Sequence, residues 1–239
     1  MRHSFLYIFL MWVVSLPLRG ETTHSLDDLD HKAADAYVKN NQAVWLSIWE
    51  DLEVNPKLAE AIIYPELIRY SYWQDQMEKT AVSGTYLSLG KKGPDFSIGH
   101  FQMKVSWIEK LEQRWMQCPL HRTLEIFFDT SDHRFARKAR LARLSDDTFW
   151  QPVYLALFIR LLYIDYPDLS DLPLVEQVRL CATAYNNGAD LPGVRKGDID
   201  RLYQWSSRSS FHVDLVTTPL TTMYCYAELA AEHYCRITK

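Results

Sequence analysis

The chain has 239 residues, of which 48% are hydrophobic and 13% are aromatic, so it can bury a full core in one domain. Eight glycines and ten prolines are too few for a low-complexity or fibrous protein. The formal net charge of −4 is small, so no overall field draws the chain to nucleic acid or to an anionic membrane. We therefore expect no nucleic-acid partner.

The N-terminal residues have the composition of an export signal, because a basic start precedes an apolar run at 5–18 that is short for a bilayer span. We expect residues 1–20 to be a cleaved signal peptide and 21–32 to be a flexible segment. The protein is then exported, most simply to the periplasm, without stable membrane insertion after cleavage. A retained N-terminal anchor is the alternative, because Leu18 is larger than the residue usual at that position of a cleavage site.

Apolar residues recur at helical spacing along the rest of the chain, so we expect a mostly α domain over 33–239. No runs of alternating apolar and polar residues of useful length indicate β-strands. A loop is predicted at 83–95, where three glycines and a proline cluster. Helices are predicted at about 33–52, from Pro56 through Glu66, and at about 101–115, 134–143, 149–166, 172–186 and 220–237.

Four cysteines follow the signal, and an oxidising compartment permits disulfides whose pairing the spacing does not determine. Two of them flank one predicted helix and lie about 15 Å apart along it, too far to bridge each other. Cys118, His121, His233 and Cys235 are ligand types for zinc, but their spacing matches no compact zinc module, and we expect no metal or cofactor. The cysteines are Cys118, Cys181, Cys225 and Cys235.

Glu66 follows Pro65 in the apolar stretch 61–68. Proline lacks an N–H and disfavours helical geometry at the residue before it, so we expect the helix to bend or restart here. A poorly solvated glutamate has a raised pKa and keeps a proton near neutral pH, as a general acid must. The plainer interpretation is an ordinary glutamate near a helix N-terminus, paired with Arg69.

Two later segments add polar residues next to glycine. In 96–104, Gly99 lets the backbone approach a ligand closely, and Gln102 follows on entry to a helix. In 182–188, a predicted helix ends in Asn187-Gly188. Taken singly, the first segment is a loop leading into a helix and the second is a common helix C-cap.

Together and in this order, the three segments resemble the catalytic domain of lytic transglycosylases, in the goose-type lysozyme superfamily. In that family a helix ends in a catalytic glutamate, and segments Gly-Leu-Met-Gln and Ala-Tyr-Asn-x-Gly follow. The matching residues here are Ala61-Ile62-Ile63-Tyr64-Pro65-Glu66, Gly99-His100-Phe101-Gln102 and Ala184-Tyr185-Asn186-Asn187-Gly188. The resemblance covers residues 56–190 and implies a lysozyme-like single catalytic domain.

The resemblance also implies an enzyme that cleaves the β-1,4 bond between MurNAc and GlcNAc in peptidoglycan glycan strands. In this family one glutamate protonates the leaving oxygen, and its carboxylate then takes the proton of the muramyl 6-hydroxyl. A 1,6-anhydro ring closes without water or a cofactor. By this resemblance Glu66 is the acid and base, and the substrate-binding residues are Ser97, Gly99, Gln102, Tyr185 and Asn186.

Several alternatives stay open at this point. Leu67 stands where the family commonly has serine, and the spacing from Glu66 to the glycine segment is long. Glu78 is a competing acid, although its polar neighbours would leave it solvated. A hydrolytic muramidase would need a second carboxylate to activate water, and Asp75 and Asp95 are the candidates.

Two further alternatives are not enzymes. The first is a peptidoglycan-binding protein that keeps the fold and the groove without turnover. The leucine at position 67, where the family commonly has serine, favours this alternative. The second uses the basic helix at 134–143 to bind an anionic polymer in a salt-dependent way. The plainer interpretation of that helix is a solvated face.

Overall fold

The computed structural model describes residues 26–70, 84–90, 95, 97–187, 199–206, 210–212 and 223–239. Most of these residues are helical, which confirms the mostly α prediction. The expected signal peptide, Asp75 and Glu78 lie outside the described residues. Across the described ranges, no helix combines the length and apolar character that a membrane span requires.

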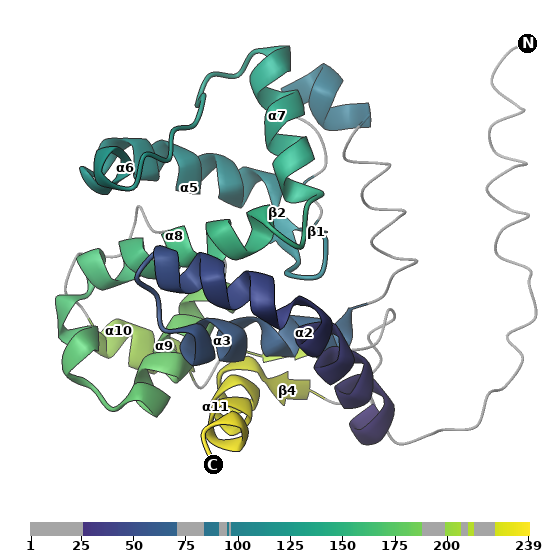
Figure 1. Ribbon diagram of the computed structural model, residues 1–239, viewed down its shortest axis with the longest axis vertical. Coiled ribbons are helices and arrows are strands. Elements are labelled where there is room, and N and C mark those ends of the chain that lie inside the picture. Colours follow the sequence, from purple (N-terminus) through teal and green to yellow (C-terminus); the bar gives the residue numbers. More distant parts are fainter. Residues whose placement is uncertain are drawn as a thin grey trace, which may run out of the picture.

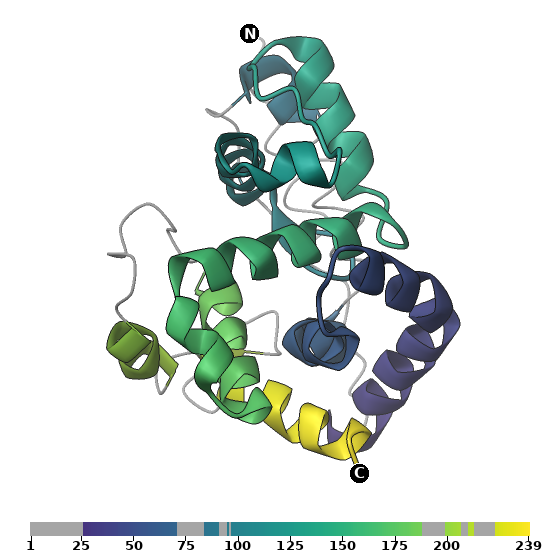
Figure 2. The same cartoon turned by 60° about the vertical axis from the view of Figure 1, so that its left-hand side comes forward.

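Helix α3 (Pro56–Arg69) is the centre of the fold, and every residue from Leu58 to Leu67 is buried. Asn55 begins the helix as its N-cap, because its side-chain oxygen accepts a hydrogen bond from Leu58 N at 3.1 Å. The view in Figure 2 runs nearly along α3 and shows four helices around it. These are α2 (Leu26–Asp51), α8 (Trp150–Asp165), α9 (Leu174–Asn186) and α11 (Tyr226–Ile237).

Helix α3 continues through Pro65 to Arg69, so the expected restart of the helix at this residue is wrong. Pro65 cannot donate a hydrogen bond to the Ala61 carbonyl. Its helix is nevertheless buried among four others, so tertiary packing maintains the helical geometry. Glu66 therefore lies near the C-terminal end of a buried helix and not at a new N-terminus.

Helix α8 separates α3 and its neighbours from a second group of helices (Figure 1). It is buried along nearly its whole length, which confirms the prediction of a buried central helix at 149–166. The second group contains α5 (Val105–Gln117), α6 (Leu120–Thr123), α7 (Arg134–Leu144) and the helical residues 84–89.

Two short antiparallel hairpins interrupt the helices and were not predicted. In the first, β1 (Ser97–Ile98) pairs with β2 (Met103–Lys104). In the second, β3 (Ser210–His212) pairs with β4 (Met223–Cys225), so that α11 begins at Tyr226 and not near residue 220. Strands of two or three residues are too short to show a period of two in the sequence. The 3-10 helix η3 (Pro167–Asp171) and α10 (Ile199–Ser206) complete the described elements.

The start of α2 differs from the expectation of a flexible segment over 21–32, because the helix already begins at Leu26. His31 Nδ1 lies 3.0 Å from the Tyr64 hydroxyl of α3, and Ala34 is buried. Packing against α3 therefore extends α2 toward the N-terminus. Near the other end of α2, the Trp49 indole donates a hydrogen bond to the Pro152 carbonyl of α8 at 3.2 Å.

The basic run at 134–143 forms α7, but it is not a uniformly solvated face. Arg140 is 1% exposed, and its Nε donates to Glu112 Oε2 at 2.7 Å. Arg143 donates to the other oxygen of the same carboxylate, also at 2.7 Å. Glu112 is fully buried, so its charge requires these partners. Arg140 is thus part of the core, and the half-buried Arg143 is held against the same carboxylate.

All four cysteines are free thiols. Cys225 is the N-cap of α11 and Cys235 lies near its end, so the helix keeps them apart as expected. No group of three or more metal-ligand side chains occurs within the part of the chain that the structure describes.

Candidate functional site

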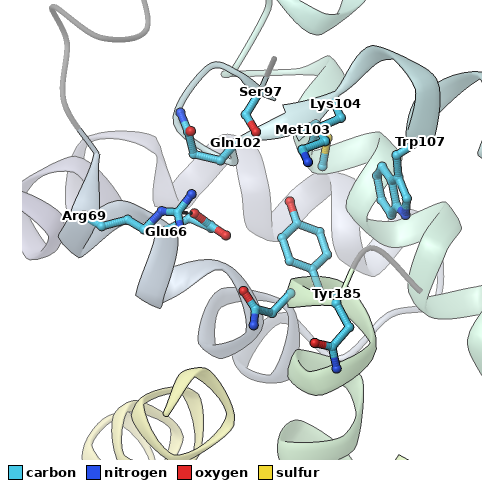
Figure 3. A pocket seen from close by; sticks show the side chains of 10 residues that line it. Glu66, Arg69, Ser97, Gln102, Met103, Lys104, Trp107 and Tyr185 are labelled. Carbon is cyan, nitrogen blue, oxygen red and sulfur yellow. Dashed lines mark ion pairs between the residues drawn. The ribbon is translucent and has the colours of Figure 1, made fainter. Parts of the chain in front are cut away.

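A cavity of about 280 Å³ opens where the C-terminal ends of α3 and α9 meet the β1–β2 hairpin (Figure 3). Five of the six predicted site residues line it, and they come from all three sequence segments: Glu66, Ser97, Gln102, Tyr185 and Asn186. Five further lining residues were not nominated as ligand-binding: Arg69, Met103, Lys104, Trp107 and Asn187.

Glu66 is the one carboxylate among the described residues that line the cavity. It is only 5% exposed. Burial raises the pKa of Glu66 from 4.5 to about 7, although the charge of Arg69 and the hydroxyl of Tyr226 act to lower it. A carboxyl with this pKa is protonated in much of the population at neutral pH, which suits a general acid.

Arg69 is the immediate neighbour of Glu66 in the cavity, where Figure 3 shows the two side chains paired. Its Nε lies 2.8 Å from Glu66 Oε2, one turn along α3. That oxygen accepts no well-aligned hydrogen bond from a described residue, so the contact is mainly a charge–charge interaction. The charge of Arg69 lowers the pKa of Glu66, but by less than burial raises it.

Gly99 is not itself in the cavity wall, but it shapes the loop between β1 and β2. Its φ is +74°, and a Cβ at this position would lie 1.9 Å from Gln151 Nε2. Gln151 is fully buried and holds the loop: its Oε1 accepts from Phe101 N at 2.9 Å, and its Nε2 donates to Ile98 O at 3.0 Å. Gln151 was not predicted from the sequence, although its position as the one amide side chain in the apolar stretch 149–166 could have indicated it.

Gln102 has a φ of +51°, an uncommon conformation for a residue other than glycine. Its backbone N–H and its side-chain Nε2 both donate to the Gly99 carbonyl, at 3.0 Å and 2.9 Å. The loop therefore fixes the orientation of this side chain at the cavity wall. Such local strain is typical of positions whose geometry serves a ligand.

Tyr185 joins the end of α9 to the same loop. Its hydroxyl donates to the Phe101 carbonyl at 2.6 Å, and burial raises its pKa well above the ordinary range. The ring meets Trp107 edge to face, with centroids 5.7 Å apart. Trp107, which also lines the cavity, contributes an apolar wall.

His100 supports the loop from outside the cavity. Its ring lies between those of Tyr37 and Tyr70, with centroids 3.8 Å away on each side. Its Nδ1 pairs with Asp147 Oδ2 in the turn before α8. The position of a leucine in the resembled motif is therefore occupied by a histidine that connects α2, the end of α3 and this turn.

The structure also places two residues on which the alternatives depended. Asp95 Oδ1 and Oδ2 accept hydrogen bonds from the backbone N and the hydroxyl of Ser106, at 3.0 Å and 2.6 Å, and Asp95 does not line the cavity. Leu67 is 5% exposed and belongs to the hydrophobic core. The position at which the resembled family commonly has serine is thus used for packing here.

Comparison of the chain with protein-family models, with curated proteins and with solved structures gave no match. A functional inference therefore rests on the residues of the cavity and on their chemistry.

Proposed function

We propose that the protein is a peptidoglycan lytic transglycosylase with a lysozyme-like fold, exported to the periplasm. It cleaves the MurNAc–GlcNAc β-1,4 bond and forms a 1,6-anhydroMurNAc end. The observation that carries the proposal is Glu66, a buried carboxyl with a pKa of about 7 in a cavity whose described lining holds no second carboxylate. The meeting of the three motif segments in this cavity supports the same conclusion.

The proposed reaction uses the Glu66 carboxyl twice. Glu66 first donates its proton to the glycosidic oxygen while the bond from this oxygen to the muramyl anomeric carbon breaks, and GlcNAc leaves as an alcohol. The muramyl ring then has oxocarbenium character. The Glu66 carboxylate accepts the proton of the 6-hydroxyl, whose oxygen attacks the anomeric carbon and closes the ring. The carboxyl is protonated again, and no water is consumed.

The other lining residues bind and orient the sugars in this proposal. Ser97, Gln102 and Asn186 offer the hydroxyl and amide groups that pair with sugar hydroxyls and N-acetyl groups. Trp107 and Tyr185 form the apolar side of the cavity. General acid–base catalysis supplies roughly 10²–10⁴ in rate, and positioning by these residues adds to it.

The test is mass spectrometry of the products released from purified peptidoglycan by the wild-type protein, by Glu66→Gln and by Glu50→Gln. Glu50 is an exposed glutamate of α2 outside the cavity, which makes its variant a matched control. We expect anhydro-muramyl products from the wild type and the control, and none from Glu66→Gln. Products with reducing ends would indicate a muramidase. Binding to the sacculus without products would refute the enzyme and favour a recognition protein.

A further inference from the structure

A second cavity, of about 700 Å³, lies at the opposite end of α3 and α9 from Glu66. Its wall comes from the connection between α2 and α3, the start of α6, the second half of α8 and the first turn of α9. Figure 1 shows these segments on the side of the molecule away from the β1–β2 hairpin. The volume falls in the range of pockets that hold small molecules, roughly 300–1,000 Å³. The two cavities share no described lining residue, so the second one is a separate candidate binding site.

The wall of this cavity is mainly aliphatic. Its most buried members are Val54, Leu58 and Ile159. Ile164 and Leu174 belong to the same wall, although they are 42% and 41% exposed. Apolar side chains that remain open to solvent around a hollow are typical of a surface that binds an apolar partner.

The polar side chains on the α8–α9 side of the cavity are already paired with one another. The Tyr163 hydroxyl donates to Gln177 Oε1, and Gln177 Nε2 donates to the Leu172 carbonyl at 2.7 Å. A ligand group that lies against them therefore gains little from hydrogen bonding. This part of the cavity favours an apolar ligand body.

Charge is confined to the edge next to the α2–α3 connection. Arg160 is the one cation among the described lining residues, and its Nη1 donates to Glu53 Oε2 at 2.6 Å. The Glu53 side chain is 70% exposed, so this ion pair contributes little to stability and can be exchanged. The N-terminal ends of α3 and α9, which carry partial positive charge, also lie at this cavity. An anionic group is therefore favoured at this edge.

We propose that this cavity binds a free long-chain fatty acid, with the alkyl chain against the aliphatic wall and the carboxylate on Arg160. The planar guanidinium matches a carboxylate, which takes the place of Glu53 while the Glu53 side chain turns to water. Each methylene buried against the wall strengthens binding roughly fourfold. This inference is independent of the proposed function, because the described linings of the two cavities have no residue in common.

The test is calorimetry on the full chain with octanoate, decanoate, dodecanoate and 1-dodecanol, each below the concentration at which it aggregates. We expect one acid to bind per chain, with an affinity that rises roughly tenfold for each added pair of methylenes. Dodecanoate should bind about tenfold more tightly than 1-dodecanol, which has the same chain without the charge.

Two substitutions separate the carboxylate contact from the apolar contact. Arg160→Gln should reduce the affinity for dodecanoate to that for 1-dodecanol and leave the alcohol unaffected. Leu174→Asp, at an exposed position of the wall, should weaken both ligands at least about tenfold. The matched controls are Arg179→Gln and Leu89→Asp, because Arg179 pairs with Glu228 and Leu89 is 56% exposed, both outside the described lining. Both controls should bind as the wild type does.

Binding that does not saturate, or that is independent of chain length, would overturn the inference. So would equal affinity for dodecanoate and 1-dodecanol, or dodecanoate binding that survives both Arg160→Gln and Leu174→Asp. The aliphatic wall would then fit an apolar segment of a protein partner better than a fatty acid. None of these outcomes bears on cleavage by Glu66, which is measured separately.

Discussion

Burial of Glu66 makes the stability of the protein depend on pH. The folded-state pKa of about 7 lies above the ordinary value of 4.5, so the folded state binds this proton more tightly than the unfolded chain. The stabilising contribution is complete below pH 4.5 and is lost as the pH rises through 7. By linkage, ionised Glu66 lowers the free energy of unfolding by about 3 kcal/mol.

Glu66→Gln should therefore be more stable than the wild type at about pH 8, by up to roughly 3 kcal/mol, and the difference should shrink toward acid pH. Urea denaturation of both proteins at acid and alkaline pH measures this directly. Glu50→Gln serves again as the control, since its carboxyl is exposed. A Glu66→Gln difference that is the same at both pH values would show that the carboxyl is not poorly solvated.

The same pKa predicts how the rate depends on pH. A general acid must be protonated, so kcat/KM, which reports the free enzyme, should fall as the pH rises above about 7. Since Arg69 lowers the pKa of Glu66, Arg69→Gln should shift this decline to higher pH. Profiles of kcat/KM for both proteins give the comparison, and an unshifted or downshifted decline would argue against the pairing of these two residues.

At the scale of elements, the β1–β2 loop depends on the contact between Gly99 and Gln151. Gly99→Ala forces a Cβ to within 1.9 Å of Gln151 Nε2 at a φ of +74°. We expect a loss of unfolding free energy of more than about 1 kcal/mol and a larger loss of activity, because the loop carries Gln102. Gly84→Ala is the control, since nothing lies within 4 Å of its added Cβ. Equal behaviour of the two variants in thermal melting and in turnover would contradict this role.

Helix α7 is attached to the core through charge as well as through apolar contacts. Arg140→Met leaves buried Glu112 with Arg143 and the Tyr154 hydroxyl, which donates to it at 2.6 Å. Removing one partner of a buried ion pair typically costs about 3–5 kcal/mol. Lys138→Met, at an exposed position of the same helix, should change the unfolding free energy by less than about 0.5 kcal/mol. Chemical denaturation of both variants measures this difference in unfolding free energy. A small loss in both variants would show that the ion pairs of Arg140 contribute little to stability.

At the scale of the whole molecule, α11 closes the ring of helices around α3. Tyr226 is fully buried, and its hydroxyl donates to the Ile62 carbonyl at 2.9 Å. His233 Nε2 also lies 2.8 Å from Glu60 Oε1, on a second buried turn of α3. Without α11, an apolar side of α3 and α9 would be exposed to water.

A chain that ends at Cys225 should therefore lose cooperative thermal unfolding, whereas removal of the exposed Lys239 alone should leave the transition unchanged. Circular dichroism on heating distinguishes the two. A sharp, unshifted transition in the shorter chain would show that α11 is dispensable for the fold.

The sequence predicted the parts of this fold that follow from apolar periodicity, and it missed those that depend on distant partners. The buried helix at 149–166 was evident because its apolar run is long. The continuation of α3 through Pro65 was not evident, because it depends on packing by four other helices. The buried state of Arg140 likewise depends on Glu112, twenty-eight residues away in the sequence.

For the site, local motifs indicated Glu66, Gln102 and Tyr185, and the fold brings them to one cavity. Lys104 and Trp107 carry no motif of their own and became visible only through the geometry of the hairpin and the first turn of α5. Residues that reach a site through tertiary contacts alone leave no pattern at fixed spacing.

Isotope labelling distinguishes cleavage without water, directed by Glu66, from hydrolysis. Peptidoglycan is digested by the wild-type protein in water enriched in the heavy oxygen isotope, and the new muramyl ends are analysed by mass spectrometry. We expect anhydro ends that contain no heavy oxygen, because the 6-hydroxyl supplies the attacking atom. Muramyl ends that carry heavy oxygen at the anomeric position would show attack by water and would contradict it.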